Sequence, residues 1–348
     1  MAIKRGVSFY SYQQAQYFGW MDWHDMCKEL HDNLKCDGVE IINEATVPGY
    51  PFPSKEFLGE WHNTMARYGL KPIAFDGFLD TMRFRDHVLN YAEAAELLKL
   101  DLQQAHDMGF RHIRTMTGLP NEVAELALPT AEKLDVKIAW EIHNPIPIRP
   151  NPEIQGLFCE NPGTAVARTV EFIEKTGTKH LGFQPDMGIF MKGPYISSCE
   201  AMIRHIKDEG LKAELEAAFK ASTPQEFSAL CREKYADRLN PGELRQVSWK
   251  TTADPKDLEL ILPYVFSFHG KVHNMVEIPG QPGHYDDPVT MNKEVIDILK
   301  KNNWDGYICT EYEGQRAYQD RGFDGLQDEV EQVRRHHEML RRLIGEEE

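Results

Sequence analysis

Four short apolar stretches of the sequence end in side chains that commonly bind metal ions in proteins. These endings are "WEIH", "QPDMG", "FHGKVH" and "TEYEG", and they contain Glu141, Asp186, His269 and Glu311. Carboxylates at the edge of a hydrophobic core cost free energy unless an opposite charge compensates them. Oxygen donors with one imidazole suit Mn²⁺, with Mg²⁺ and Co²⁺ as alternatives. Any one of these residues alone would more often be a cap or an ion-pair partner, but together they predict a divalent metal site.

The spacing inside two of these endings separates a deeper residue from a shallower one. Glu141 and His143 are two residues apart, and so are Glu311 and Glu313. Residues with this spacing share one face of an extended strand. We therefore expect Glu141 and Glu311, the deeper members, to bind the metal. His143 and Glu313 would lie nearer the mouth, facing the substrate or supporting the ligands.

The stretch "FHGKVH" offers two imidazoles for one ligand position. His269 directly follows the apolar "VFSF" and lies nearer the core, so it is the preferred ligand, with His273 as the alternative. Lys271 lies between them, and with Arg316 it is a cationic group expected to contact substrate oxygens. Other polar residues near strand ends could bind substrate hydroxyls or equally form salt bridges at the rim: Tyr10, Glu40, Asp76 and Arg114.

Eight compact, largely apolar runs alternate with amphipathic helical patterns from one end of the chain to the other. Runs of this kind are typical of a parallel sheet that is buried on both faces. An unbroken β-then-α alternation favours one (β/α)8 TIM barrel over residues 1–348 rather than a doubly wound sheet. The eight predicted strands are 4–12, 37–43, 71–78, 111–118, 136–143, 179–186, 264–273 and 305–313.

One connection is much longer than the others. The segment 193–262, between the predicted sixth and seventh strands, reads as two or three helices joined by "STPQ". Loops that follow barrel strands carry function in this architecture, so we interpret the segment as a helical insertion that acts as a lid or a subunit contact. A passive insertion that thickens the outer ring of helices is the alternative.

Composition excludes several classes of function. The formal net charge is −16, with 39 Lys and Arg against 55 Asp and Glu, which argues against nucleic acid as a partner. No stretch resembles a signal peptide or a membrane span, so we expect a cytoplasmic location without membrane association. The six cysteines show no paired spacing, which indicates reduced, structural thiols.

The strand endings resemble those of xylose-isomerase-like barrels, the sugar phosphate isomerases and epimerases, over nearly the whole chain. The phrases "RGVSFYSYQQ", "DGVEIINE", "EIHNP" and "TGTKHLGFQPDMGIF" more specifically resemble the catalytic (alpha) subunit of bacterial C-glycoside deglycosidases. The superfamily resemblance implies that the four matching positions hold a divalent metal. The deglycosidase resemblance implies a 3-oxo-C-glucoside substrate, often of a flavonoid, and a small beta subunit as partner.

A carbon–carbon glycosidic bond requires chemistry other than that of ordinary glycosidases, because it has no leaving-group oxygen to protonate. A ketone at carbon 3 of the sugar makes the proton on carbon 2 acidic. A base can remove this proton, and the resulting enediolate expels the aglycone from carbon 1. His143 is the candidate base, since its unperturbed pKa lies near neutrality. Alternatively, His143 could serve only to support the metal ligands.

Two other functions fit parts of the sequence. A sugar isomerase or epimerase acting on free ketoses would begin with the same α-proton abstraction, and there Glu141 and Glu311 would themselves move the proton. A phosphorylated substrate is not expected, because no glycine-rich phosphate loop is visible. A catalytically silent barrel acting as a scaffold would bind no metal, but it gives no reason for the four-ligand set.

Overall fold

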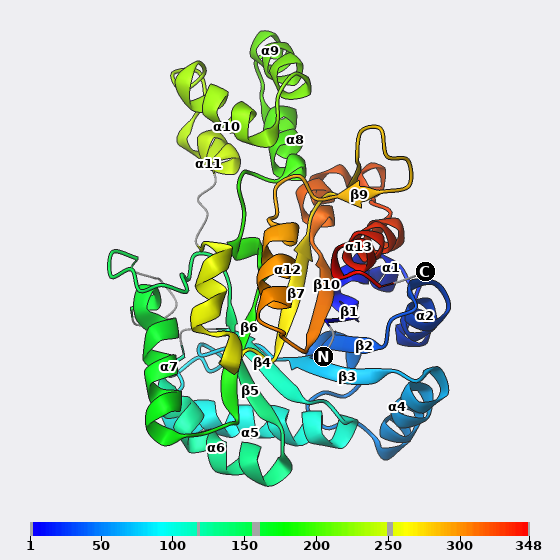
Figure 1. Ribbon diagram of the computed structural model, residues 1–348, viewed down its shortest axis with the longest axis vertical. Coiled ribbons are helices and arrows are strands. Elements are labelled where there is room, and N and C mark those ends of the chain that lie inside the picture. The colour runs from blue at the N-terminus through cyan, green and yellow to red at the C-terminus, as the bar shows by residue number, and fades with distance from the viewer. Residues whose placement is uncertain (1–2, 117–118, 155–160, 249–252, 347–348) are drawn as a thin grey trace.

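The computed structural model describes residues 3–116, 119–154, 161–248 and 253–346 (Figure 1). Within these ranges, one sheet contains eight strands in the order β6-β5-β4-β3-β2-β1-β10-β7, and each neighbouring pair is parallel. Isolated parallel bridges, Phe183 to Val265 and Asp186 to His269, join the two edge segments. The sheet is therefore a nearly closed barrel, as predicted.

The barrel strands coincide with the eight predicted runs but are shorter at their ends. Residues 117 and 118 of the predicted fourth strand lie outside the described residues. A small antiparallel hairpin, β8 (Val276–Glu277) and β9 (Tyr285–Asp286), was not predicted. The barrel strands are β1 (Lys4–Ser8), β2 (Gly38–Ile42), β3 (Lys71–Asp76), β4 (His112–Met116), β5 (Lys137–Ile142), β6 (Leu181–Pro185), β7 (Ser267–Val272) and β10 (Tyr307–Tyr312).

Local signals at the helix ends explain why the chain returns to the sheet where it does. Helix α5 (Tyr91–Met108) begins at a capping box formed by Asn90 and Glu93, and it ends at Gly109, whose φ is +80°. Glycine accepts this left-handed conformation without strain, so it stops the helix directly before β4. The other main helices are α1 (Gln13–Tyr17), α2 (Trp23–Glu29), α3 (Asn43–Thr46), α4 (Lys55–Tyr68), α6 (Asn121–Leu134), α7 (Ala165–Thr176), α12 (Asn292–Lys301) and α13 (Glu329–Ile344).

The last helix begins later than the sequence pattern indicates. An apolar stripe predicts a helix over 324–344, but α13 starts at Glu329, where Asp328 caps it by accepting a hydrogen bond from the Glu331 N–H. Residues 314–325 instead form the 3-10 segment η7, interrupted at Gly322, whose φ is +58°. The segment η7 directly follows β10 and therefore lies at the rim of the barrel.

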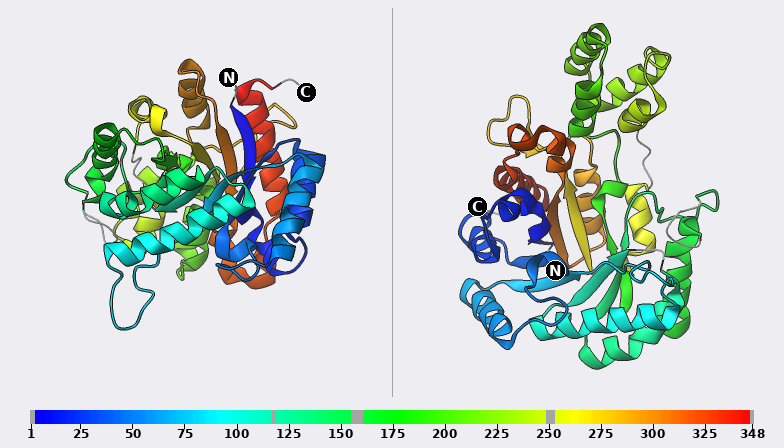
Figure 2. Two further views of the ribbon diagram at one scale, coloured as in Figure 1. Left: turned by 90° about the horizontal axis from the view of Figure 1, so that it is seen from below. Right: turned by 180° about the vertical axis from the view of Figure 1, so that it is seen from behind.

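Between β6 and β7 the chain forms helices that project from one end of the barrel (Figures 1 and 2). They share their own apolar core, which includes Met202, Leu215 and Phe227. One of their polar links to the barrel is an ion pair from Arg204 to Asp320 in η7, at 2.7 Å. The helices are α8 (Ile196–His205), α9 (Glu209–Lys220), α10 (Pro224–Glu233) and α11 (Pro241–Val247).

The barrel interior is polar, whereas TIM barrels are ordinarily filled by branched apolar side chains. Gln184 on β6 donates to Glu40 on β2 at 2.7 Å, although these strands are not neighbours in the sheet. His112 on β4 lies 2.8 Å from the Gln184 amide oxygen. Buried polar groups of this kind require partners, and here they find them across the barrel, directly beneath the predicted site.

Candidate metal centre and active site

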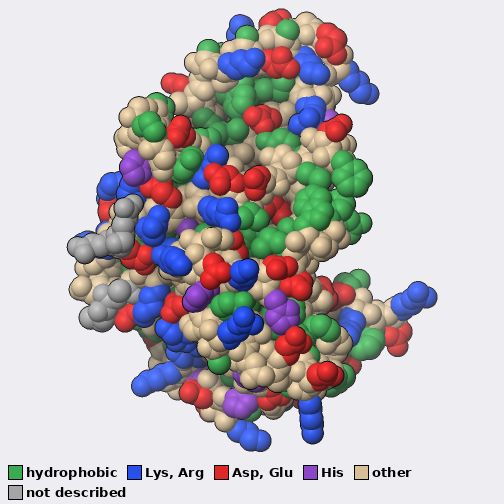
Figure 3. Space-filling model, turned by 90° about the vertical axis from the view of Figure 1, so that its right-hand side faces the viewer, with side chains coloured by type: hydrophobic (Ala, Val, Ile, Leu, Met, Phe, Trp, Pro, Cys, Tyr) green, Lys and Arg blue, Asp and Glu red, His purple; other side chains and the backbone are tan. Residues whose placement is uncertain are grey.

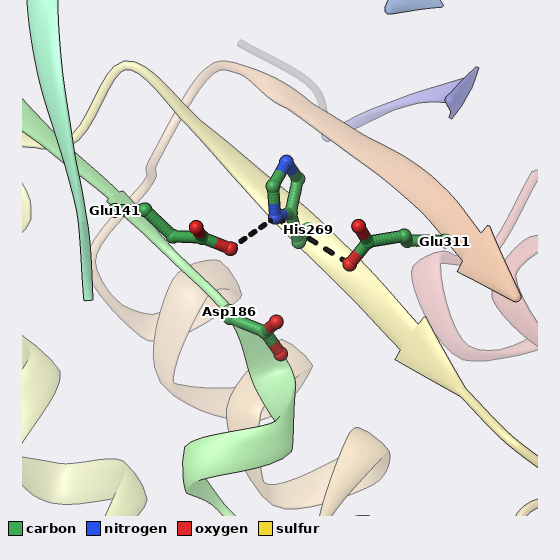
Figure 4. A group of neighbouring side chains, drawn as sticks. All are labelled: Glu141, Asp186, His269 and Glu311. Carbon is green, nitrogen blue, oxygen red and sulfur yellow. Dashed lines mark hydrogen bonds and ion pairs between the residues drawn. The ribbon is translucent and has the colours of Figure 1, made fainter. Parts of the chain in front are cut away.

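The predicted ligands come together at the ends of four strands, as Figure 4 shows. Glu141, Asp186, His269 and Glu311 each offer a donor atom, and these atoms all lie within 4.8 Å of one another. His269 is central, with its Nδ1 2.8 Å from a Glu141 oxygen and 3.5 Å from a Glu311 oxygen. All four residues are buried, so water cannot easily compensate their charges.

A chain of buried polar contacts orients the His269 ring from below. Its other nitrogen, Nε2, lies 3.0 Å from Glu40 Oε1, a contact close enough for an ion pair but not well aligned as a hydrogen bond. The second Glu40 oxygen accepts from Gln184, which contacts His112 in turn. Ligating histidines commonly place their far nitrogen against a carboxylate in this way. The arrangement turns Nδ1 of His269 toward the other donors.

Lys271 lies among the carboxylates at the same level of the barrel. Its Nζ is 2.5 Å from Glu311, 2.9 Å from Glu313 and 3.0 Å from Asp186. Burial lowers the pKa of Lys271, but these three carboxylates outweigh that effect and raise it well above its ordinary value. Lys271 is therefore a fixed cation facing the site, and its contact with substrate oxygens stays a prediction.

The buried carboxylates of the centre have pKa values shifted in both directions. Burial, with Asp76 beside it, raises the pKa of Glu40 to about 7, and burial also raises the pKa of Asp186. Among the described residues, Glu40 Oε1, Asp186 Oδ2 and Glu311 Oε2 are buried atoms without a hydrogen-bond partner. The ammonium of Lys271 lies 3.0 Å from this Asp186 oxygen and 2.5 Å from this Glu311 oxygen. Burial raises the pKa of Glu311, but Lys271 and His269 outweigh burial and lower it. Three carboxylates and one imidazole, all buried and with donor atoms within 4.8 Å of one another, fit a hard divalent ion.

His143 lies just beyond the end of β5, nearer the mouth than Glu141, as predicted. Its Nδ1 is 2.9 Å from the Asn144 carbonyl oxygen, so Nδ1 carries the proton and Nε2 is left as the basic atom. Nε2 is 3.7 Å from Asp186, and the side chain is 39% exposed. Burial lowers the pKa of His143, but Asp186 and Glu141 outweigh it and raise the pKa. Such a group can accept a proton from a molecule at the mouth.

Glu313 connects several of the predicted substrate-binding residues at the rim. One of its oxygens accepts a hydrogen bond from the Tyr10 hydroxyl at 3.1 Å and pairs with Arg316 at 3.2 Å, while the other pairs with Lys271. The Arg316 guanidinium lies over the Tyr10 ring, 5.2 Å from its centroid. Glu313 therefore holds a tyrosine and two cations in one group.

Arg114 and His273 lie beside the centre but are not among its four donors. Arg114 is buried beneath the mouth, 3.4 Å from Asp76 and 3.5 Å from Glu141. It therefore forms salt bridges, one of the two roles that the sequence left open for it. His273 stacks on Tyr195 with 3.2 Å between ring centroids, and its Nε2 is 3.9 Å from Glu313. His269, not His273, joins the other three donors.

Sequence reasoning missed the residues that support His269. His112 and Gln184 lie within strands, where a single polar residue gives no sign of the partner it meets across a barrel. Glu40 and Asp76 were noted only as rim residues, whereas both are fully buried and face His269. A signal was present, because strands buried on both faces rarely contain a carboxylate without a partner.

Comparisons with known proteins bear on the whole chain. No protein-family model matches it. It is 26% identical to the 3'-dehydrocarminate deglycosidase alpha subunit of a Microbacterium species, over 99% of this chain and 97% of that protein. It is 25% identical to a C-glycoside deglycosidase alpha subunit of Arthrobacter globiformis, over 99% of this chain and 93% of that one. The chain is similar to C-glycoside deglycosidase alpha subunits along nearly its whole length. The resemblance seen in the sequence is confirmed.

Solved structures agree on the fold of this relative of the deglycosidases. The IOLI protein, whose crystal structure contains a bound zinc atom, matches with a TM-score of 0.55 and 11% identity over 99% of this chain and 98% of that one. L-ribulose 3-epimerase matches with a TM-score of 0.53 and 12% identity over 99% and 95%. These likenesses confirm the TIM barrel.

Within the described ranges, no helix is both long and apolar enough to cross a membrane.

Proposed function

We propose that this chain cleaves the carbon–carbon glycosidic bond of 3-oxo-C-glucosides with aromatic, flavonoid-type aglycones. The observation that carries the proposal is the site itself: four buried donors within 4.8 Å of one another, with a histidine base at their mouth. The names of the full-length relatives support the reaction class. The enzyme would be a carbon–carbon lyase rather than a hydrolase.

His143 would act as the general base through Nε2, taking the proton from carbon 2 of the sugar. The electron pair left on carbon 2 forms a double bond to carbon 1, and the bond from carbon 1 to the aglycone breaks. The aglycone carbon leaves with the electron pair of that broken bond and takes up a proton. The proton that His143 removed balances this one, so no co-reactant is consumed. A positioned histidine base typically contributes about 10²–10⁴ in rate.

The residues around the base would hold the sugar and its developing charge. Glu141, Asp186, His269 and Glu311 would hold a divalent ion, with Mn²⁺ preferred and Mg²⁺ or Co²⁺ as alternatives. When bound, such an ion supplies Lewis-acid stabilisation of negative charge on substrate oxygens. Lys271 adds a second, permanent positive charge in a buried site, where electrostatic stabilisation is strong. Glu313, Tyr10 and Arg316 would bind sugar hydroxyls at the rim.

We further propose that the active form is a hetero-oligomer with a small beta subunit. The relatives are named as alpha subunits, which implies a second subunit in those proteins. In this chain the projecting helices α8 to α11, within the segment 193–262, offer a surface for such a partner or for a lid. The ion pair between Arg204 in α8 and Asp320 in η7 connects this surface to the rim of the site.

The proposal is tested by incubating the purified chain with Mn²⁺ and a 3-oxo-C-glucoside of a flavonoid, with and without a co-expressed candidate beta subunit. Release of the aglycone, followed by chromatography, is the expected result. A parallel panel of free ketoses tests the isomerase or epimerase alternative. Interconversion of ketoses without aglycone release would replace the lyase proposal with that alternative.

A further inference from the structure

A large cavity opens on the barrel rim beside the proposed active site. Its volume is about 910 Å³, and its walls come from the segments after β1, β2 and β3 and from η7. Tyr10 lines the cavity, and its hydroxyl also donates a hydrogen bond to Glu313. The cavity therefore adjoins the site directly. Cavities of about 300–1,000 Å³ are typical of sites for drug-sized molecules. A sugar held at the metal centre would leave this cavity free.

Aromatic rings line the cavity, and further rings contact one of them. Phe78 lies on one wall and is 51% exposed, and the Phe18 ring stacks on Trp20 and contacts Phe323 at centroid distances of 5.1 and 5.3 Å. Tyr17, which also lines the cavity, is 84% exposed. Figure 3 faces the side of the molecule on which α1 and α13 lie, and it shows hydrophobic side chains gathered there among charged groups. Exposed rings clustered in this way indicate a binding surface for an apolar, planar molecule.

The cavity wall includes a buried amide with unused hydrogen-bonding capacity. Gln315 lines the cavity, is only 1% exposed, and follows Glu313 by two residues. Within the described part of the chain, neither its amide nitrogen nor its amide oxygen has a hydrogen-bond partner. A buried amide without partners is costly, and native proteins rarely keep one without a reason. A ligand hydroxyl at this position would satisfy it.

We propose that this cavity binds the aglycone, as a planar aromatic group that carries hydroxyls. The assignment rests on the proposed function, because it places the sugar at the metal centre and the aglycone on the Tyr10 side of it. Phe78 and Phe18 contact the ring faces, and Gln315 recognises a hydroxyl. The cavity therefore selects the aglycone, while the metal centre selects the oxidised sugar.

The test measures binding of two free probes to the full chain by fluorescence titration: the tetrahydroxyflavone luteolin and unsubstituted flavone. Phe78→Ala removes a ring from the wall and should raise the Kd of both probes about tenfold. Gln315→Leu should weaken luteolin about tenfold and leave flavone unchanged, because only luteolin offers hydroxyls. Phe52→Ala is the control, since Phe52 is 76% exposed and does not line this cavity.

The outcomes separate this proposal from the proposed function. If luteolin does not bind the wild-type chain, or binds Phe78→Ala and Phe52→Ala equally, the cavity assignment is wrong, even if aglycone release is observed. If both probes bind as expected but no C-glycoside is cleaved, the cavity stands as an aromatic site and the lyase proposal fails. Phe18→Ala repeats the Phe78 test at a second wall, so that one misfolded variant does not decide the result.

Discussion

The contact between Glu40 and His269 allows a sharp test of how the metal centre is built. We predict that Glu40→Gln lowers the affinity for Mn²⁺. Both side chains are fully buried, and Nε2 of His269 lies 3.0 Å from Glu40 Oε1. A glutamine keeps the shape but removes the charge. The glutamine has only one side-chain oxygen, so it can accept from either His269 or the Gln184 amide but not from both. Its NH₂ group must face the other residue, where two hydrogen-bond donors then oppose each other.

The expected magnitude follows from the geometry. Loss of a carboxylate that supports a metal-binding histidine typically costs 10–100-fold in metal affinity. The Glu40 contact is close but imperfectly aligned, so we expect the lower end, about a tenfold rise in Kd, or about 1.4 kcal/mol.

Isothermal titration of the metal-free chain with Mn²⁺ measures this change without any substrate. Glu56→Gln is the matched control, because Glu56 is exposed in the first turn of α4 and faces no ligand. It should bind Mn²⁺ with the wild-type Kd. A Glu40→Gln variant that is folded and also binds with the wild-type Kd would refute the orienting role of Glu40.

Four further predictions test individual residues. Glu311→Gln should abolish aglycone release and raise the Mn²⁺ Kd at least tenfold by titration; an active variant that binds metal normally would exclude Glu311 as a ligand. His143→Ala should bind Mn²⁺ normally but lose about 10²–10⁴ in kcat, and normal turnover would assign the base elsewhere. Lys271→Met should bind Mn²⁺ more tightly, since the ammonium shares Asp186 and Glu311 with the ion; weaker binding would contradict this. Burial raises the pKa of Glu329 to about 7 from 4.5, so the folded state holds its proton more tightly. The contribution of Glu329 to the free energy of unfolding is therefore largest at low pH, and on the order of 3 kcal/mol of it is lost as pH rises from about 4.5 to about 7. In chemical denaturation across this range, the free energy of unfolding of Glu329→Gln should change less with pH than that of the wild type.

The barrel and its four donors could be predicted because each depends on a short local pattern. A run such as "YICTEYE" shows an apolar strand, its carboxyl end and the two-residue alternation in one place. Parallel strands bring their carboxyl ends to one rim, so the meeting of Glu141, Asp186, His269 and Glu311 follows from the fold class alone.

The features that were missed depend on contacts between distant segments. Gln184 meets Glu40 only because β6 and β2 face each other across a closed barrel, and no spacing in the sequence encodes that pairing. The late start of α13 depends on the Asp328 cap and on the backbone turn at Gly322, which override an apolar stripe that includes Leu326. The same stretch, η7, forms one wall of the aglycone cavity.

The central claim is tested most directly by aglycone release from a 3-oxo-C-glucoside of a flavonoid. The chain is freed of metal and combined with a candidate beta subunit, and the mixture is assayed by chromatography before and after Mn²⁺ is restored. We expect little release before Mn²⁺ is restored, full release afterwards, and none from Glu311→Gln under either condition. No release in the restored wild-type complex, together with metal-dependent interconversion of free ketoses, would contradict the claim.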